Sequence, residues 1–135
     1  MKSLEQILEF RNIQPTAMRL LVLKTLQKTD YALSLSELEN HFEQADKTTL
    51  YRTLKTFEKN KLVHSIDDGS GSIKYALCDL NCECLPEQAH VHFHCNKCEQ
   101  TFCMKEYALP KISLPKKFIA EEINWVIKGL CEKCS

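Results

Sequence analysis

Four cysteines in two pairs are the side chains of this sequence best suited to chemistry: Cys95, Cys98, Cys131 and Cys134. Two residues separate the cysteines of each pair, which allows a tight turn to close around one metal ion. Four thiolates from two such turns complete a tetrahedral zinc shell with no position open for a substrate, so we expect a structural zinc site. The alternative is a pair of disulfides. The N-terminal sequence lacks the pattern of an export signal, and in the cytoplasm we expect metal binding instead.

A second group of ligand-type side chains lies just before the first cysteine pair. Histidines alternate with apolar residues at positions 90, 92 and 94, and alternate side chains of a strand share a face. We therefore expect a strand that carries the three histidines on one face and directs Cys95 to the other. Zinc accepts imidazole and thiolate ligands together. The candidate ligands of this second, regulatory site are His64, Cys78, His90 and His92, with Cys103 in reserve.

Two further cysteines, Cys82 and Cys84, lie in a polar stretch before the histidines. They fit free thiols, a metal-capture arm or oxidisable sensors, and the sequence does not choose among these roles. A catalytic zinc would need an open position and a nearby general base. The chain has no HExxH and no HxE paired with PCxxC. A zinc hydrolase or deaminase is therefore a distant alternative, and we expect a protein that is not an enzyme.

The elements that position these ligands begin with helices in the first 60 residues. Ser3 and Ser34 each stand three residues before a Gln or Glu, the spacing of a capping box, and Asp46 can cap a further helix. Pro15 suits the first turn of a second helix. Apolar residues at helical spacing predict a buried stripe on that helix: Met18, Leu21, Val22 and Leu26.

The helix after Asp46 is the candidate for reading nucleic acid. Leu50, Leu54 and Phe57 recur at helical spacing and predict its inner face. Residues 47–61 hold five Lys or Arg and one Glu, although the whole chain has a net charge of zero. The outer face, together with Arg19, supplies the candidate DNA contacts: Arg19, Lys47, Thr48, Thr49, Tyr51, Arg52 and Lys55. The cations would neutralise phosphates, while the polar side chains reach groove edges.

A hairpin is predicted next, with strands at 62–66 and 73–77 and a glycine-containing turn at 67–71. Helices followed by a hairpin form a winged helix. A protein-interaction module of the same shape without DNA contact remains an alternative. Further on, apolar residues at a period of two predict a long strand that leads into the second cysteine pair: Ile119, Ile123, Trp125 and Ile127.

We therefore expect an α+β chain with three parts. Residues 1–78 form a winged helix-turn-helix DNA-binding domain, and residues 79–89 form a linker. Residues 90–135 form a small α/β metal-binding dimerisation domain with the four-cysteine zinc site and a sheet edge available to a second copy. No apolar stretch approaches the roughly 20 residues that span a bilayer, so we expect no membrane partner.

The order of these parts resembles the ferric uptake regulator (Fur) family over nearly the whole chain. The resemblance rests on Thr16 and Arg19 in PTAMR, then on KTTLYRTLKTFEKNKLV, HVHFHCNKC and the terminal GLCEKC. It implies a dimeric, metal-dependent winged-helix repressor of a palindromic DNA operator. By this resemblance Tyr51 and Arg52 match the family's DNA-contacting pair, and the two cysteine pairs match its structural zinc shell. The regulatory-metal histidines of the family match His90 and His92.

Departures from the family pattern bear on the choice of metal. Iron-sensing members usually supply an N-terminal histidine where this chain reads Asp30-Tyr31-Ala32, and a carboxylate where it has Cys103. Zinc uptake regulators similarly carry a cysteine ligand at the position of Cys78. Thiolate in place of carboxylate favours zinc over iron(II) or manganese(II), so the chain is closest to the zinc uptake regulator branch. Ala89 and Val91 cannot supply a further family site, which leaves two metal ions per chain.

The function expected from the sequence is a zinc-sensing DNA-binding repressor that acts as a homodimer in the cytoplasm. Zn²⁺ would fill the structural site, and Zn²⁺, or alternatively Fe²⁺ or Mn²⁺, the regulatory site. An iron- or peroxide-sensing repressor of the same family and a thiol-redox sensor remain the alternatives.

Overall fold

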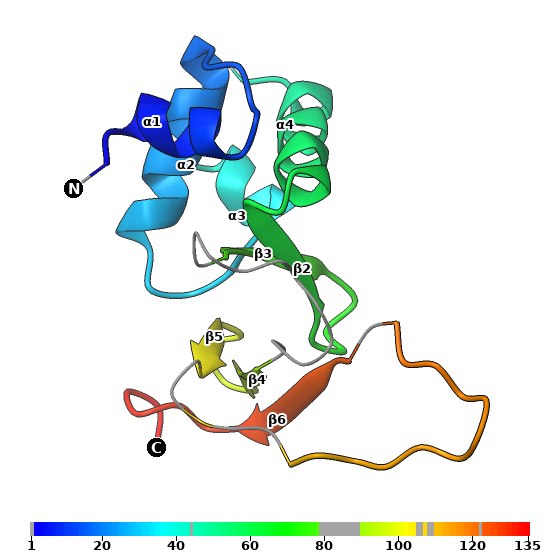
Figure 1. Cartoon of the computed structure of the whole chain (residues 1–135). Helices are drawn as coiled ribbons and strands as arrows, with labels where there is room; N and C mark the ends of the chain where they lie inside the picture. The colour runs from blue at the N-terminus through cyan, green and yellow to red at the C-terminus, as the bar shows by residue number, and fades with distance from the viewer. Residues whose placement is uncertain (1, 44, 79–89, 105–106, 108–109, 122) are drawn as a thin grey trace.

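The computed structural model describes residues 2–43, 45–78, 90–104, 107, 110–121 and 123–135. Helices and strands follow in the order α1 (Leu4–Phe10), α2 (Ala17–Lys28), β1 (Leu33–Ser34), α3 (Leu35–Glu39), α4 (Lys47–Lys59), β2 (Val63–Asp67), β3 (Ile73–Leu77), β4 (Val91–Cys95), β5 (Thr101–Met104) and β6 (Trp125–Gly129) (Figure 1). This order confirms the α+β class. From residue 90 onward the described elements are strands. None of the helices in the described ranges is long and apolar enough to cross a membrane.

The predicted helix starts agree with the structure at three of four places. Ser3 and Ser34 each form a complete capping box, and the Asp46 side chain accepts a hydrogen bond from the Thr48 amide. The start of α2 was predicted wrongly. Thr16 is its N-cap, because the Thr16 Oγ1 accepts the Arg19 amide at 3.3 Å, and Pro15 precedes the helix rather than lying in its first turn.

The hydrophobic core lies among the helices and the first sheet. The inner face of α4 is buried as predicted, with Leu50, Leu54 and Phe57 at most 1% exposed. The stripe predicted for α2 was wrong at Leu21, which is 47% exposed, because Leu23 turns inward in its place. Neighbouring helix positions differ by about 100°, so a stripe centred on Val22 includes one flanking residue and exposes the other.

Two three-stranded sheets follow one another along the chain. The first has the order β1-β3-β2, and its β2–β3 hairpin is the wing. The second has the order β5-β4-β6, with β4 antiparallel to β5 and parallel to β6. The long strand predicted before the second cysteine pair is shorter than expected, since Ile119 and Ile123 lie outside β6 and are exposed. Pairing begins at Val91 with Trp125, so β6 starts where its partner β4 starts.

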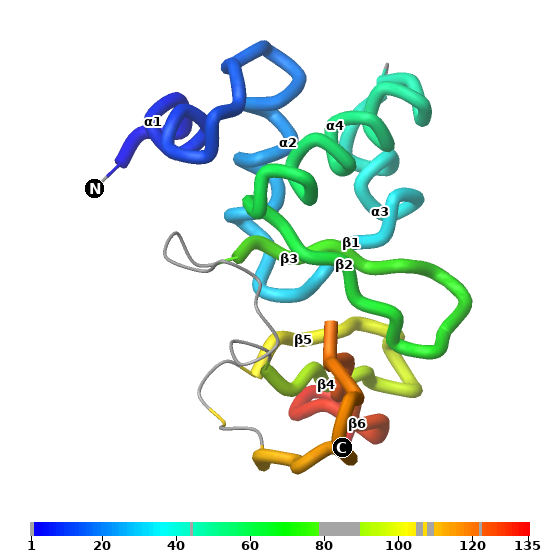
Figure 2. Tube along the Cα trace, turned by 45° about the vertical axis from the view of Figure 1, so that its right-hand side comes forward, coloured from blue at the N-terminus to red at the C-terminus, as the bar shows by residue number. Residues whose placement is uncertain are grey.

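The wing lies between the helices and the second sheet (Figures 1 and 2). A backbone bridge joins the two halves directly, because the Ala32 amide donates to the Thr101 carbonyl at 2.7 Å. Side chains from the first sheet can therefore meet side chains from the second.

Candidate metal centres and DNA-reading helix

The four paired cysteines meet at one end of the second sheet. Cys95 ends β4 and pairs with Gly129 of the parallel strand β6, so the turns that follow both strands leave the sheet side by side. The donor sulfurs of all four cysteines lie within 4.8 Å of one another, and none is in a disulfide. The sulfurs of Cys98 and Cys131 are 3.8 Å apart. A tetrahedron with zinc–sulfur bonds of about 2.3 Å has edges of about 3.8 Å, so this geometry fits a zinc shell.

The electrostatics of this cluster also favour a bound dication. Hydrogen bonds from the backbone amides of Cys98 and Cys131 outweigh burial and lower the pKa of Cys95 to about 5. The neighbouring Cys131 sulfur, followed by burial, raises the pKa of Cys134 to about 12. The Cys95 thiolate is therefore held ready by the backbone, while Cys134 ionises at neutral pH only when a cation offsets the repulsion from its neighbours. This donor set fits the zinc that the sequence predicts for it.

A second cluster joins the wing to the second sheet. His64 comes from β2, His92 from β4, Cys103 from β5, and His90 from the residue before β4. Their donor atoms lie within 4.8 Å of one another. The Nε2 atoms of His92 and His64 are 3.3 Å apart, and the Cys103 sulfur is 3.8 Å from the same His64 nitrogen. Zinc–nitrogen bonds of about 2.0–2.1 Å give tetrahedral nitrogen–nitrogen edges of about 3.4 Å, which matches this spacing.

The protonation of this cluster suits a metal ion. Burial, with a smaller contribution from the charge of His90, lowers the pKa of His92 to about 4. The His92 ring is therefore neutral near pH 7 and able to donate a lone pair. Three imidazoles and one thiolate form a borderline-soft donor set that zinc accepts.

The two cysteines considered for this cluster occupy different places. Cys103, which the sequence places in reserve, lies within the group of four because it pairs with His92 across β4 and β5. The Cys78 sulfur lies 3.2 Å from the other nitrogen of the His64 ring, Nδ1. The position of Cys103 in this cluster follows from the register of β4 with β5. A tight turn after Cys95 returns β5 along β4 and places residue 103 opposite residue 92. Cys82 and Cys84 lie outside the described residues.

The third histidine of the strand has a different environment. His94 shares the buried face of β4 with His92, as the alternation predicts. However, the Nδ1 atom of His94 lies 2.9 Å from the Thr101 hydroxyl and 3.2 Å from Asp68. His94 is not one of the four residues in the cluster around His64. Asp68 and its partner Lys74 were not anticipated from the sequence.

The outer face of α4 is exposed as predicted. Lys47, Thr48, Thr49, Tyr51, Arg52 and Lys55 all point away from the core. Lys55 forms an ion pair with Glu58 at 3.2 Å, which reduces the charge it offers to a partner. Arg19 of α2 is half-buried, and its guanidinium donates to the Gln14 carbonyl at 2.9 Å. Among the predicted DNA contacts, Arg52 is thus the exposed guanidinium at the centre of the helix face.

Comparisons with known proteins agree with this architecture. The sequence profile of the Ferric uptake regulator family matches residues 11–130. The chain is 28% identical over 131 residues to the Ferric uptake regulation protein of Campylobacter jejuni subsp. jejuni serotype O:2, with 93% of this chain and 77% of that protein aligned.

Solved structures share the fold. The Vibrio cholerae ferric uptake regulator has a TM-score of 0.67 at 18% identity, with 96% of this chain and 100% of that chain covered. A zinc uptake regulator complexed with zinc and DNA also has a TM-score of 0.67, at 22% identity, with 96% and 88% covered. At these identities the likeness concerns the fold, whereas the family profile spans most of the sequence. The chain therefore belongs to the ferric uptake regulator family, whose members are metal-dependent DNA-binding regulators.

Proposed function

We propose that this protein is a zinc-responsive repressor that binds double-stranded DNA as a homodimer. The observation that carries the proposal is the position of the second cluster, which takes one donor from the wing and three from the second sheet. A metal ion held by all four donors would tie the DNA-reading half of the chain to the other half. Metal occupancy would thereby set the orientation of α4.

The positions of the four donor residues explain how metal binding would be coupled to the orientation of α4. His64 lies on β2, five residues after the last residue of α4, so its position and that of the helix change together. His90, His92 and Cys103 lie on or beside two paired strands, which hold them as one rigid unit. Changing the ratio of two orientations from 1:99 to 99:1 needs about 5.5 kcal/mol of differential affinity, which a zinc site can supply.

The donor set supports zinc as the regulatory metal. The four residues of the cluster include no carboxylate, and iron(II) or manganese(II) suits sites that are richer in oxygen. An iron-responsive or manganese-responsive repressor is the alternative, and a metal titration of DNA binding distinguishes the three ions.

The second sheet supports pairing with another copy of the chain. Within the described residues β6 is an edge strand, and an edge offers unpaired backbone groups to a partner. Large apolar side chains near this edge are exposed, including Ile127 and Leu130 at 53% each. A symmetric dimer would present two copies of α4 to successive major grooves, about 34–36 Å apart, and would bind a palindrome.

The proposal is tested by selecting bound sequences from a pool of random duplex DNA in the presence of zinc. We expect a palindromic site, protected in two successive major grooves and bound by a protein that sediments as a dimer. Recovery of no preferred sequence with zinc, iron(II) or manganese(II) would leave a protein-interaction module as the better account of the winged helix.

Arg52→Ala is expected to weaken operator binding by about 1–3 kcal/mol if the guanidinium reads a base. Both metal sites should stay filled, because Arg52 is exposed on α4 and contacts neither cluster. Fluorescence anisotropy with operator DNA measures the affinity, and metal analysis checks the zinc content. Lys24→Ala, which removes an exposed cation from α2, is the control. Equal losses in the two variants would show that Arg52 acts only through its charge.

Cys103→Ser and Cys78→Ser are expected to affect the regulatory site differently. Cys103→Ser removes one of the four clustered donors. Cys78→Ser removes only the sulfur beside Nδ1 of His64, a loss of orientation that typically lowers metal affinity by about 10–100-fold. In the cobalt-substituted protein, the thiolate-to-cobalt charge-transfer band of this site should vanish in Cys103→Ser and persist in Cys78→Ser. The reverse pattern would make Cys78 the ligand.

A further inference from the structure

The wing of this protein has the wrong charge for a DNA contact. Its turn, residues 68–72, has an aspartate and no Lys or Arg, and Asp67 precedes it. The one Lys or Arg between residues 63 and 77 is Lys74, which is 3% exposed. The Lys74 ammonium donates to Asp68 Oδ2 at 2.9 Å. The hairpin therefore presents no cation of its own to DNA phosphates, whose neutralisation supplies much of the affinity of DNA-binding proteins.

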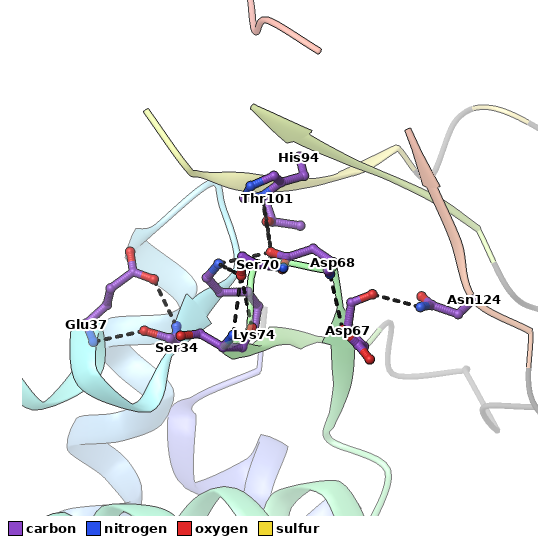
Figure 3. Close-up of polar contacts among 11 residues, drawn as sticks. Ser34, Glu37, Asp67, Asp68, Ser70, Lys74, His94, Thr101 and Asn124 are labelled. Atoms are coloured by element: carbon purple, nitrogen blue, oxygen red, sulfur yellow. Dashed lines mark hydrogen bonds and ion pairs between the residues drawn. The ribbon is translucent and has the colours of Figure 1, made fainter. Parts of the chain in front are cut away.

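Asp68 instead faces the second sheet and is 1% exposed. Its Oδ2 accepts a hydrogen bond from the Thr101 hydroxyl at 2.6 Å and lies 3.2 Å from His94 Nδ1 (Figure 3). Its Oδ1 accepts the Ser70 amide at 2.9 Å, which shapes the turn. Burial opposes ionisation, but the hydrogen bonds from Ser70, Thr101 and Lys74 keep the pKa of Asp68 well below its usual value.

Two more contacts attach the wing to the same sheet, one at Asp67 and one at the turn. The Asn124 side-chain amide, just before β6, donates to the Asp67 carbonyl at 2.8 Å (Figure 3). The Lys128 ammonium of β6 occupies the space that a Cβ at Gly69 would fill, and Gly69 has a φ of +82°. This cation lies against the turn that contains Asp68, so the charges are complementary. The wing turn thus contacts residues from all three strands of the second sheet.

We infer that the wing of this protein couples the two domains instead of touching DNA, and that Asp68 is the residue that positions it on the second sheet. This inference rests on the proposed function, because it assigns the wing a part in the metal response. His64 and Asp68 lie four residues apart on the same hairpin. The polar contact of Asp68 with Thr101 aligns the hairpin on the second sheet. Metal binding by the cluster around His64 then acts on a hairpin that is already aligned with this sheet.

The contacts between the wing and the second sheet can be removed by mutation without removing the contacts within the wing. The Asp68–Lys74 pair lies within the N-terminal half, whereas the Thr101 hydroxyl reaches Asp68 from β5. Thr101→Val removes that hydroxyl, preserves the β-branched shape that suits a strand, and leaves the ion pair intact. Asp68→Asn is the more severe change because it leaves a buried ammonium without its counter-charge. Asp67→Asn, an exposed neighbour in the wing, is the matched control.

The test measures two quantities in the full-length protein with the four-cysteine site loaded with zinc. The first is the exchange rate of the Ala32 amide, which donates to the Thr101 carbonyl across the junction. The second is operator affinity at saturating zinc. We expect Thr101→Val and Asp68→Asn to speed Ala32 exchange by about 10-fold or more and to weaken operator binding by a similar factor. Asp67→Asn should leave both quantities within about twofold of the original protein.

The outcomes distinguish this inference from the proposed function. Absence of zinc-dependent operator binding in the unmodified protein would contradict the proposed function, while Ala32 exchange would still report on the Asp68 contact. Unchanged Ala32 exchange in Thr101→Val would overturn the role of Asp68. A gain in operator affinity of about 10-fold in Asp67→Asn, with steeper salt dependence, would place the wing beside phosphates and overturn the coupling role.

Discussion

Replacing Cys95 with serine is expected to prevent metal binding at the four-cysteine cluster and to unfold the second sheet. Among the described residues from 90 onward, the buried apolar side chains are those of Cys95 and Cys131. The described part of this half therefore has little aliphatic core of its own, and we expect metal ligation to supply much of its stability. Structural zinc contributes about 10–16 kcal/mol in small zinc domains, against a total of about 5–15 kcal/mol for a typical folded protein.

Zinc content per chain and circular dichroism melting check this result. Cys95→Ser should lose one zinc ion per chain, melt without a cooperative transition in its second half, and fail to dimerise. Cys103→Ser serves as the control for folding and dimerisation, because it removes a thiol from the same sheet without touching the four-cysteine cluster. It should keep the cooperative transition and the dimer, and any metal that it loses should come from the cluster around His64. An intact Cys95→Ser dimer with full zinc content would show that this cluster has no structural role.

Replacing His92 with alanine is expected to abolish the response of DNA binding to zinc. The His92 ring is 7% exposed, and its Nε2 lies 3.3 Å from the Nε2 of His64. Its loss removes a donor of the second sheet that faces the wing histidine and leaves the sheet without that link. Operator affinity at saturating zinc should fall by about 100-fold or more, toward the value for the protein without regulatory metal.

The measurement is a titration of operator binding with zinc in His92→Ala and in His41→Ala. His41 is exposed and lies outside both clusters, so its removal controls for the loss of a histidine. The four-cysteine zinc should be retained in both variants. A zinc response of normal size in His92→Ala would remove this histidine from the regulatory site.

Local features were the most predictable part of this protein. The caps at Ser3, Ser34 and Asp46 and the two faces of α4 depend on side chains within one or two turns, so spacing alone indicates them. The four-cysteine cluster was equally easy to predict from the sequence, because two CxxC turns restrict the metal geometry strongly.

Features that depend on pairing between distant segments were harder to predict. The start of β6 depends on the start of β4, so the apolar alternation at Ile119 and Ile123 was mistaken for strand. The place of Cys103 beside His92 depends on the register of β4 with β5. The hydrogen bond of Thr101 to Asp68 joins residues 33 positions apart, and no local pattern marks a buried carboxylate contact across such a junction.

The most direct test of the account compares operator affinity at one and at two zinc ions per chain. Mild chelation removes the labile ion from the cluster around His64, and metal analysis verifies that the four-cysteine zinc remains. The account predicts that restoring the second ion tightens operator binding by about 100-fold or more. Equal affinity at one and two zinc ions per chain would contradict it, because the junction would then orient α4 without regard to metal.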